Sequence, residues 1–278
     1  MSLIDFIISL SLISVSAGLL GSLIGLGGGV IIVPVLTLVY HVDIRLAIGA
    51  SILSVIATSS GAAVTYVRER LTNLRAGMFL EIATTVGAIT GAYLTTVIAS
   101  KSLFVLFAIV LAYSALTIVR KRKDPEILKQ SKDKIANYLK LHGSYYDEKL
   151  KRTVKYKVQN TKLGLGLMYI AGIVSALLGV GSGALKVPAM DAAMHMPMKA
   201  SAATSDFMIG VTAAASAGAY FVRGEINPLI AGPVVIGVLV GAIAGSRLLN
   251  KISSNLIKLI FVFVLIVVAI EMLQRGLA

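Results

Sequence analysis

Ten apolar stretches decide what this chain can fold into, because most of them approach the length at which a helix crosses a membrane. That length is about 20 residues. The stretches lie at about 3–24, 30–41, 46–67, 76–98, 102–119, 163–178, 184–195, 200–222, 229–249 and 256–273. Charged residues make up 14% of the chain, whereas a typical soluble domain is about a quarter charged. The sequence therefore predicts an all-α polytopic membrane protein.

The residue types that are scarce narrow the chemistry further. The chain has no cysteine, which excludes disulfides, thiolate metal sites and cysteine nucleophiles, and it has three histidines. We therefore expect no metal centre and no cofactor. The first residues, Met1–Asp5, lack the basic region of a signal peptide, so we expect the first apolar stretch to be retained as a span.

Positive charge is concentrated in one segment between two apolar halves. Residues 120–162 hold 14 of the 26 Lys and Arg residues but only five of the 13 acidic ones. By the positive-inside rule this segment is cytoplasmic, and anionic lipid headgroups are a better partner for it than nucleic acid. The predicted domains are a first transmembrane repeat at 1–119, this basic loop at 120–162, and a second transmembrane repeat at 163–278.

Part of the basic segment is expected to fold as an amphipathic helix at the membrane surface. Asp124 and Pro125 are typical of a helix start, and Gly143 is typical of a helix end. The apolar side chains between them fall roughly on one helical face.

The two apolar halves resemble each other at a constant offset of 154 residues. Gly25–Pro34 aligns with Gly179–Pro188, and His41, Ser51 and Tyr66 align with a residue of the same type. Further on, Val86–Leu94 aligns with Val240–Leu248 at six identical positions of nine. A fixed offset over about 70 residues indicates an internal duplication.

The charges between the spans favour an inverted orientation of the two repeats. Five segments per half, with the short ones counted as interrupted spans, place every more basic loop in the cytoplasm and both termini outside. Four crossings per half would place Arg247, Lys251 and Lys258 outside. Inverted repeats with broken helices at matching positions are typical of secondary transporters, whose substrate site lies near the midplane.

Glycine clusters precede the short second stretch of each half. Three or more glycines within five residues weaken a helix, so we expect an unwound segment whose free N–H groups bind an anion. Close packing of helices is the alternative explanation, and it is our interpretation of Gly87 and Gly91 and of Gly241 and Gly245, each pair spaced by four residues. The candidate substrate-binding residues are Gly25, Gly27, Gly28, Gly29, Gly179, Gly181, Ser182 and Gly183, together with Ser51 and Ser205, which match across the repeat.

Several ionisable residues lie inside the apolar stretches, where a charge needs a partner or a polar cavity. Lys186 follows the second glycine cluster and is expected to add positive charge to the anion site. Asp206 is expected either to pair with Lys186 or to carry a coupling proton, and Asp191 and His195, spaced by four, to share a helix face. Glu81 is interpreted as a residue near a helix end that reaches toward the membrane surface. A buried ion pair that only fixes helix register is the alternative.

These motifs resemble the sulfite exporter TauE/SafE family of membrane permeases. The resemblance rests on two copies of G-x-G-x-G-x₄-P, on the basic central loop and on the V-G-A-I-x-G segments, and it covers roughly residues 10–119 and 163–275. It implies movement of sulfite, sulfoacetate or related organosulfonates across the cytoplasmic membrane, usually outward. It also implies that the glycine-motif residues flank the anion, and it assigns no role to Lys186 or the acidic residues.

The leading hypothesis is a secondary transporter, not an enzyme, that moves a small anion by alternating access. A membrane-embedded subunit with the basic loop as a docking arm is one alternative. An intramembrane enzyme is another, although the chain has neither an H-E-x-x-H nor a G-x-S-x-G motif. The sequence does not determine the oligomeric state.

Overall fold

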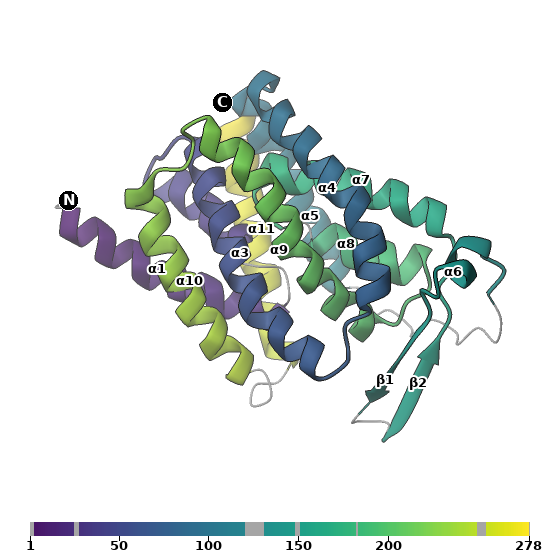
Figure 1. The fold of residues 1–278 in the computed structure, drawn as a ribbon. Coiled ribbons are helices and arrows are strands. Elements are labelled where there is room, and N and C mark those ends of the chain that lie inside the picture. The colour runs from purple at the N-terminus through teal and green to yellow at the C-terminus, as the bar shows by residue number, and fades with distance from the viewer. Residues whose placement is uncertain are drawn as a thin grey trace.

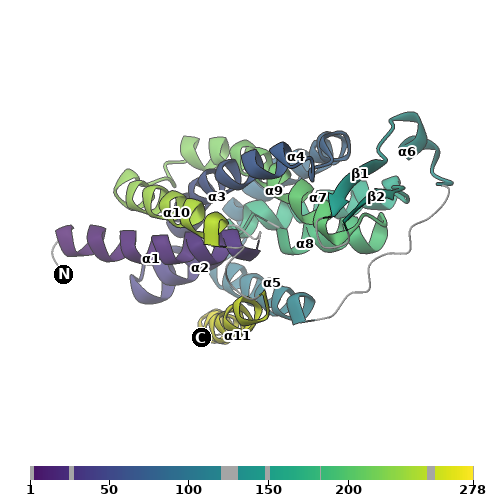
Figure 2. The same cartoon turned by 90° about the horizontal axis from the view of Figure 1, so that it is seen from below.

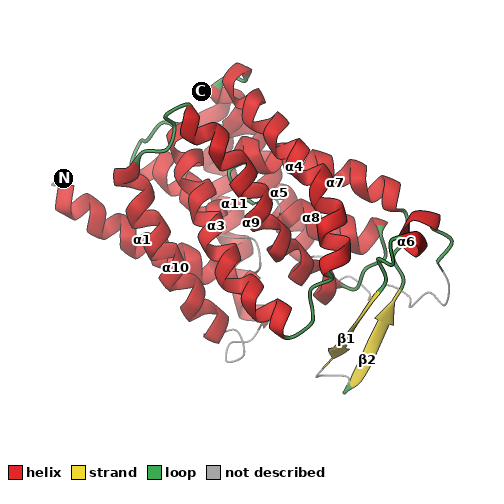
Figure 3. Cartoon of the chain, in the orientation of Figure 1, coloured by secondary structure: helices red, strands yellow, loops and turns green. Residues whose placement is uncertain are grey.

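Long helices dominate the computed structural model, which describes residues 3–24, 28–119, 131–147, 151–181, 183–248 and 254–277 (Figures 1 and 3). The long helices are α1 (Leu3–Ile24), α3 (Ile44–Arg68), α4 (Leu74–Val97), α5 (Ser100–Val119), α7 (Thr161–Leu178), α9 (Met198–Val222), α10 (Pro228–Leu248) and α11 (Ser254–Leu277). In the described part of the chain, six helices are long and apolar enough to cross a membrane. The predicted fold class, an all-α polytopic membrane protein, is confirmed.

The outward face of α4 shows why the fold needs lipid around it. Met78, Ile82, Val86 and Tyr93 are exposed at helical spacing and form an apolar stripe along the helix. Water does not tolerate so long a stripe on a monomer, whereas the hydrocarbon layer does. Glu81, Thr84 and Thr95 of the same helix are instead buried within the bundle.

Two short broken helices occupy the positions of the short apolar stretches. Helix α2 (Gly29–Pro34) continues into the π-helix η1 (Val35–Val39), and α8 (Gly183–Pro188) continues into the π-helix η2 (Ala189–Ala193). The change from the α-helix to the wider π-helix follows a proline in each case, because proline has no N–H to continue the α-helical hydrogen bonding. Each unit of eleven residues spans about 16 Å, roughly half the hydrocarbon layer.

The element bounds repeat the sequence offset of 154. Helices α2 and α8 begin and end at positions related by this offset, and so do η1 and η2, and α3 and α9. The histidine beyond each π-helix has a left-handed backbone, with φ of 54° at His41 and 56° at His195. Equivalent positions thus have the same unusual local structure in both halves.

The first broken helix returns along α1. Tyr40, after the end of η1, donates a 2.9 Å hydrogen bond from its hydroxyl to Ser9 Oγ near the start of α1, and its ring packs edge-on against Phe6. Helix α3 then runs back along α2, because Gly29 lies against Ser51 and Val55. Helix α4 in turn runs antiparallel to α3 (Figure 1).

Glycines let helices from different halves pack closely. A side chain on Gly87 or Gly91 of α4 would collide with the backbone of Tyr169 or Ile173 on α7. A side chain on Gly241 or Gly245 of α10 would likewise collide with α1. The interpretation of these four glycines as packing residues is confirmed. The pairs α1 with α10 and α4 with α7 run parallel, whereas α5 and α11 lie side by side at one face of the bundle (Figure 2). The halves are therefore interleaved.

The basic loop at 120–162, called the central segment from here on, folds differently from the prediction. Residues 120–130, which include the expected helix start at Asp124, lie outside the described residues. Beyond them the helix α6 covers only Lys134–Tyr138, and Gly143 begins a strand instead of ending a helix. Strands β1 (Gly143–Asp147) and β2 (Arg152–Tyr156) form an antiparallel hairpin. The expected helix end at Gly143 was therefore wrong, and the partner strand β2 alternates buried Val154 and Tyr156 with exposed neighbours, which is the period of a strand.

This central segment lies over one end of the bundle. Its residues Leu141, Tyr156 and Val158 share a hydrophobic cluster with Met190, Met194 and Met196. Its backbone also holds the end of η2, because Gln159 N donates to the carbonyl of Met194 over 3.1 Å. The amide of Asn73, in the turn between α3 and α4, donates to the Leu141 carbonyl over 2.8 Å.

Asp133 ties the segment to the start of α7. One carboxylate oxygen accepts from Ile135 and Ala136 N–H as a helix cap, and the other accepts from the N–H and hydroxyl of Thr161 over 2.7 and 2.8 Å. Burial alone would raise the pKa of Asp133, but the hydrogen bonds from Thr161, Ala136 and Ile135 outweigh it and lower that pKa.

We predict that acid loosens the central segment. The folded pKa of Asp133 lies below its ordinary value of 3.8, so the carboxylate stabilises the fold above that pH, and the contribution disappears as the pH falls through the folded pKa. Hydrogen exchange of β1 and β2, corrected for intrinsic rates, should be faster below about pH 4. The Asp133→Ala variant should show fast exchange already at pH 7. Asp43→Ala, at another helix start, is the control, and equal exchange in the two variants would contradict the prediction.

Candidate functional site

A lysine is enclosed at the centre of the bundle. Lys186 lies on α8, three residues after the start of that short helix, and its side chain is 0% exposed. Its ammonium donates a 2.6 Å hydrogen bond to the hydroxyl of Thr212 on α9. A buried charge of this kind persists only with a compensating partner.

The compensating charge comes from Glu81 on α4. The hydroxyl of Thr212 donates to Glu81 Oε1 over 2.7 Å, and Thr85 donates to the same oxygen over 3.3 Å. Glu81 is 8% exposed, and its other oxygen, Oε2, is buried without a hydrogen-bond partner among the described residues. The interpretation of Glu81 as a residue that reaches the membrane surface was therefore wrong, because α7 and α9 pack over that face of α4.

Thr212 joins the two charges through a single hydroxyl. It accepts from Lys186 and has one hydrogen, for which Glu81 Oε1 at 2.7 Å and the Met208 carbonyl at 2.9 Å compete. Lys186 and Glu81 are each other's electrostatic partners. Pairing of Lys186 with Asp206, one of the two roles expected for Asp206, is thus replaced by pairing with Glu81. We call Lys186, Thr212 and Glu81 the central triad.

Gly29 and Gly179, one from each glycine break, lie in close contact with each other. Ser51 donates from its hydroxyl to the Gly179 carbonyl over 2.6 Å, and a side chain on Gly29 would collide with that carbonyl and with Ser51 Oγ. Gly179 and Gly181 have positive φ, of 66° and 74°, which favours glycine. At Gly29 the geometry supports close packing of the two breaks.

The remaining candidates near the breaks have different surroundings. Gly28 lies beside Val238, since a methyl group added to this glycine would come within 3.2 Å of the Val238 side chain, and Gly183 is buried at the start of α8. Ser205 is fully buried on α9, and its hydroxyl has no hydrogen-bond partner among the described residues. Gly25, Gly27 and Ser182 lie outside the described residues.

The acidic candidates of the second half do not form one cluster. Asp191 lies within η2, which ends at Ala193, whereas His195 follows with a left-handed backbone. The expected helix face shared by Asp191 and His195 is therefore interrupted. Asp206 is buried on α9, and its backbone carbonyl accepts from the hydroxyl of Ser59 on α3 over 2.5 Å. Within the described ranges, no group of three or more His, Asp and Glu side chains is placed to hold a metal ion.

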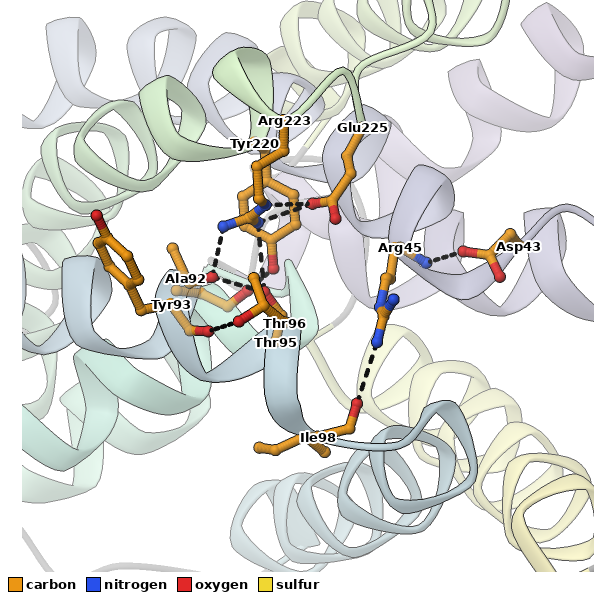
Figure 4. A network of polar contacts seen from close by, with 11 residues as sticks. Asp43, Arg45, Ala92, Tyr93, Thr95, Thr96, Ile98, Tyr220, Arg223 and Glu225 are labelled. Atoms are coloured by element: carbon orange, nitrogen blue, oxygen red, sulfur yellow. Dashed lines mark hydrogen bonds and ion pairs between the residues drawn. The ribbon is translucent and has the colours of Figure 1, made fainter.

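A second polar network closes the end of the bundle opposite the central segment (Figure 4). Arg223, after α9, donates to the Ala92 carbonyl over 2.7 Å and pairs with Glu225 at 2.7 Å, while its guanidinium stacks over the Tyr220 ring. Nearby, Arg45 donates to the Ile98 carbonyl over 3.3 Å. These contacts tie α3 and α9 to the end of α4. The sequence offers no signal for the contact of Arg223 with Ala92, because 131 positions separate the two residues.

Long helices around two broken helices and a buried charge pair define a multi-pass membrane protein of the kind that moves solutes. The family model for the sulfite exporter TauE/SafE matches residues 10–272. The chain therefore belongs to the sulfite exporter TauE/SafE family, as its motifs indicated.

Curated relatives support the same class. The chain is 30% identical over 268 residues to the probable membrane transporter protein YunE of Bacillus subtilis, covering 94% of this chain and 95% of the relative. It is 24% identical over 244 residues to the probable membrane transporter protein YdhB of the same organism, covering 87% and 89%. It is also 24% identical over 269 residues to a probable membrane transporter protein of Xylella fastidiosa, covering 95% and 94%. No solved structure matches the chain significantly. The protein is a membrane transporter.

We predict that the two charges of the central triad depend on each other. Lys186→Met leaves Glu81 buried without its counter-charge, and loss of one partner of a buried pair costs about 3–5 kcal/mol. Replacing both partners is often close to neutral, so the double variant Glu81→Gln/Lys186→Met should regain most of the loss. Thermal unfolding in detergent measures both effects, with Lys162→Met, at an exposed position, as control. A double variant as unstable as the sum of its singles would refute the pairing.

We also predict that Gly29 cannot carry a side chain. Gly29→Ala forces a methyl group against Ser51 Oγ, 2.6 Å away, and against the Gly179 carbonyl, and overpacking of this kind costs about 1–3 kcal/mol. Gly218→Ala on α9 meets nothing within 4 Å and should leave stability unchanged or raise it by up to about 1 kcal/mol. Equal stability of the two variants would contradict the close contact of Gly29 with Ser51 and Gly179.

Proposed function

We propose that the chain is a secondary transporter that exports a small sulfur-containing anion, such as sulfite, sulfoacetate or another organosulfonate, by alternating access. The observation that carries the proposal is the fully buried ammonium of Lys186 directly after the second glycine break. Such a charge in a low-dielectric centre attracts an anion strongly. The family to which the chain belongs supports the sulfur oxyanion as substrate.

The course of the helices supports two halves of opposite orientation. Helix α2 returns along α1, α3 returns along α2, and α4 runs antiparallel to α3, so α4 runs opposite to α1. Since α4 and α7 are parallel, α7 also runs opposite to α1, its counterpart in the first half. Opposed halves with broken helices at equivalent positions are the plan by which secondary transporters expose a midplane site to each side in turn.

The substrate site lies, in this proposal, where the two breaks meet. Ser51 and Gly179 contact each other across the halves there, Ser205 is the counterpart of Ser51, and Lys186 begins the adjoining helix. The hydroxyl of Ser205 is buried and has no hydrogen-bond partner among the described residues, so it is available to bind an oxyanion. Asp191 on η2 and Asp206 on α9 both belong to the second half and are candidates for adjusting the electric field at the site.

The charge distribution supports a defined orientation in the cell membrane. The central segment carries the largest excess of Lys and Arg, so we place it in the cytoplasm beside anionic lipid headgroups, and both termini outside. The network of Arg223 and Arg45 then closes the outer end of the bundle. Opening toward the outside requires these contacts to break.

The test is anion efflux from liposomes that contain the purified protein. Loaded sulfite and sulfoacetate should leave faster than from protein-free liposomes, whereas a neutral solute of similar size should not. Lys186→Gln should lower the efflux rate by at least about tenfold, because one buried charge–charge contact contributes well over the 1.4 kcal/mol that a factor of ten requires. The control is Lys162→Gln.

Two results would contradict the proposal. Efflux of both anions at the protein-free rate would exclude the substrate class. Normal efflux from a folded Lys186→Gln variant would exclude Lys186 as the charge that attracts the anion.

A further inference from the structure

The central triad is electrically balanced before any substrate arrives. Lys186 contributes one positive charge and Glu81 one negative charge, and the Thr212 hydroxyl lies within 2.7 Å of both. An anion that approaches Lys186 therefore also approaches the Glu81 carboxylate. Two negative charges this close in a water-poor centre repel each other strongly, so the second can be held only if the first is neutralised.

Glu81 has a free position for a proton. Its Oε1 is engaged by Thr212 and Thr85, whereas Oε2 is buried and has no hydrogen-bond partner among the described residues. A carboxylate oxygen that is out of water and unpartnered is costly while charged, and a proton removes that cost. Two independent features, the shared hydroxyl and the orphan oxygen, thus point to the same carboxyl group.

Thr212 transmits the change to Lys186. When Glu81 is ionised, the single hydrogen of Thr212 is drawn to Oε1, 2.7 Å away, and when Glu81 is neutral the Met208 carbonyl at 2.9 Å becomes the better acceptor. The positive charge of Lys186 is then no longer balanced by Glu81. An anion supplies the missing negative charge.

The charge that balances Lys186 across the shared hydroxyl is that of Glu81. Lys186 is the group whose charge acts on Glu81. The titratable residues of the helices around the triad, apart from its members, are Arg75 and Tyr93 on α4, Lys162 and Tyr169 on α7, Asp206, Lys199 and Tyr220 on α9, Asp191 on η2, Lys101 and Tyr113 on α5, and Arg45, Tyr66 and Arg68 on α3. The carboxylate that the shared hydroxyl contacts is that of Glu81, and its other contacts are the Lys186 ammonium and the Met208 carbonyl.

We propose that Glu81 is the proton site of the transporter, and that it takes up one proton for each anion that binds beside Lys186. The proposal rests on the proposed function and names its coupling ion. The proton enters Glu81 Oε2 from the solution on the side to which the site is open, crosses together with the anion, and leaves to the other side. A monovalent anion then crosses with no net charge, so the membrane potential does not act on the transported pair, and a sufficient outward gradient of the anion drives export.

The experiment measures protons and anions together in proteoliposomes that contain a trapped pH-sensitive dye. Sulfite and sulfoacetate fluxes are recorded at imposed pH gradients, and the number of protons moved per anion is calculated for wild type and for Glu81→Gln. This variant keeps the side-chain shape and an oxygen for Thr212 but cannot exchange a proton. The ratio should fall by about one proton per anion, and it should stay unchanged in Glu271→Gln, which removes an exposed carboxylate from α11.

The outcomes separate this inference from the proposed function. A wild type that carries neither anion contradicts the proposed function and the coupling with it. A wild type that carries an anion, together with an unchanged proton ratio in Glu81→Gln, contradicts the coupling alone.

A measurement on wild type covers the case in which Glu81→Gln does not fold. Sulfoacetate remains ionised at neutral and alkaline pH, so its binding to the purified protein reports the protein's proton. Its apparent affinity should fall by about tenfold for each pH unit above the range in which Glu81 is protonated. An affinity that does not change with pH would overturn the proposal.

Discussion

A single positive charge in a water-poor bundle is the constraint on which the centre of this structure depends. Lys186 is completely enclosed, and its charge would be prohibitive without Glu81 and the Thr212 hydroxyl between them. The three residues come from α8, α4 and α9. Those helices must therefore hold their mutual positions wherever the pair is intact. An arrangement that neutralises one member changes what the others can bind, which gives a transporter a reason to keep so costly a group.

Closure of the bundle uses polar contacts at both ends. At one end Arg223 and Arg45 tie turns to the end of α4, and at the other the central segment holds η2 through Gln159 and the Met194 carbonyl. Between these ends, glycines bring α1 against α10 and α4 against α7, so that each close pair joins the two halves. In the proposed alternating access, opening toward either side would break one polar set and leave the close helix pairs intact. This division of roles fits alternating access.

The spans, the duplication and the packing glycines were predictable from the sequence because they follow from apolar length and local spacing. The position of Lys186 within an apolar stretch indicated that it needs a partner or a polar cavity, but the sequence left its depth open. The prediction that Glu81 reaches the membrane surface was wrong, because the distance of a residue from its helix start does not indicate which other helices cover it. The partnership through Thr212 joins residues 131 positions apart, and no local pattern encodes it.

The central segment shows a different limit. Its cap residues and apolar spacing predicted a surface helix, but the hairpin is held by Tyr156 and Val158 packed on methionines of η2 and the following turn. That contact depends on where the broken helix ends, which the sequence alone left open. The left-handed His195 has the same origin, because it reverses the chain after a π-helix that residue spacing does not reveal.

The central claim, a buried site that opens to each side in turn, is tested most directly by thiol labelling at Ser205. The chain has no cysteine, and Ser205→Cys is nearly isosteric and breaks no hydrogen bond among the described residues. Ser102→Cys and Tyr138→Cys, both exposed, are expected to mark the outer and the cytoplasmic side. The account predicts that a membrane-impermeant reagent reaches the thiol at position 205 from either side, with sulfite changing the ratio of the two rates. Labelling from one side only, whatever anion is present, would contradict it.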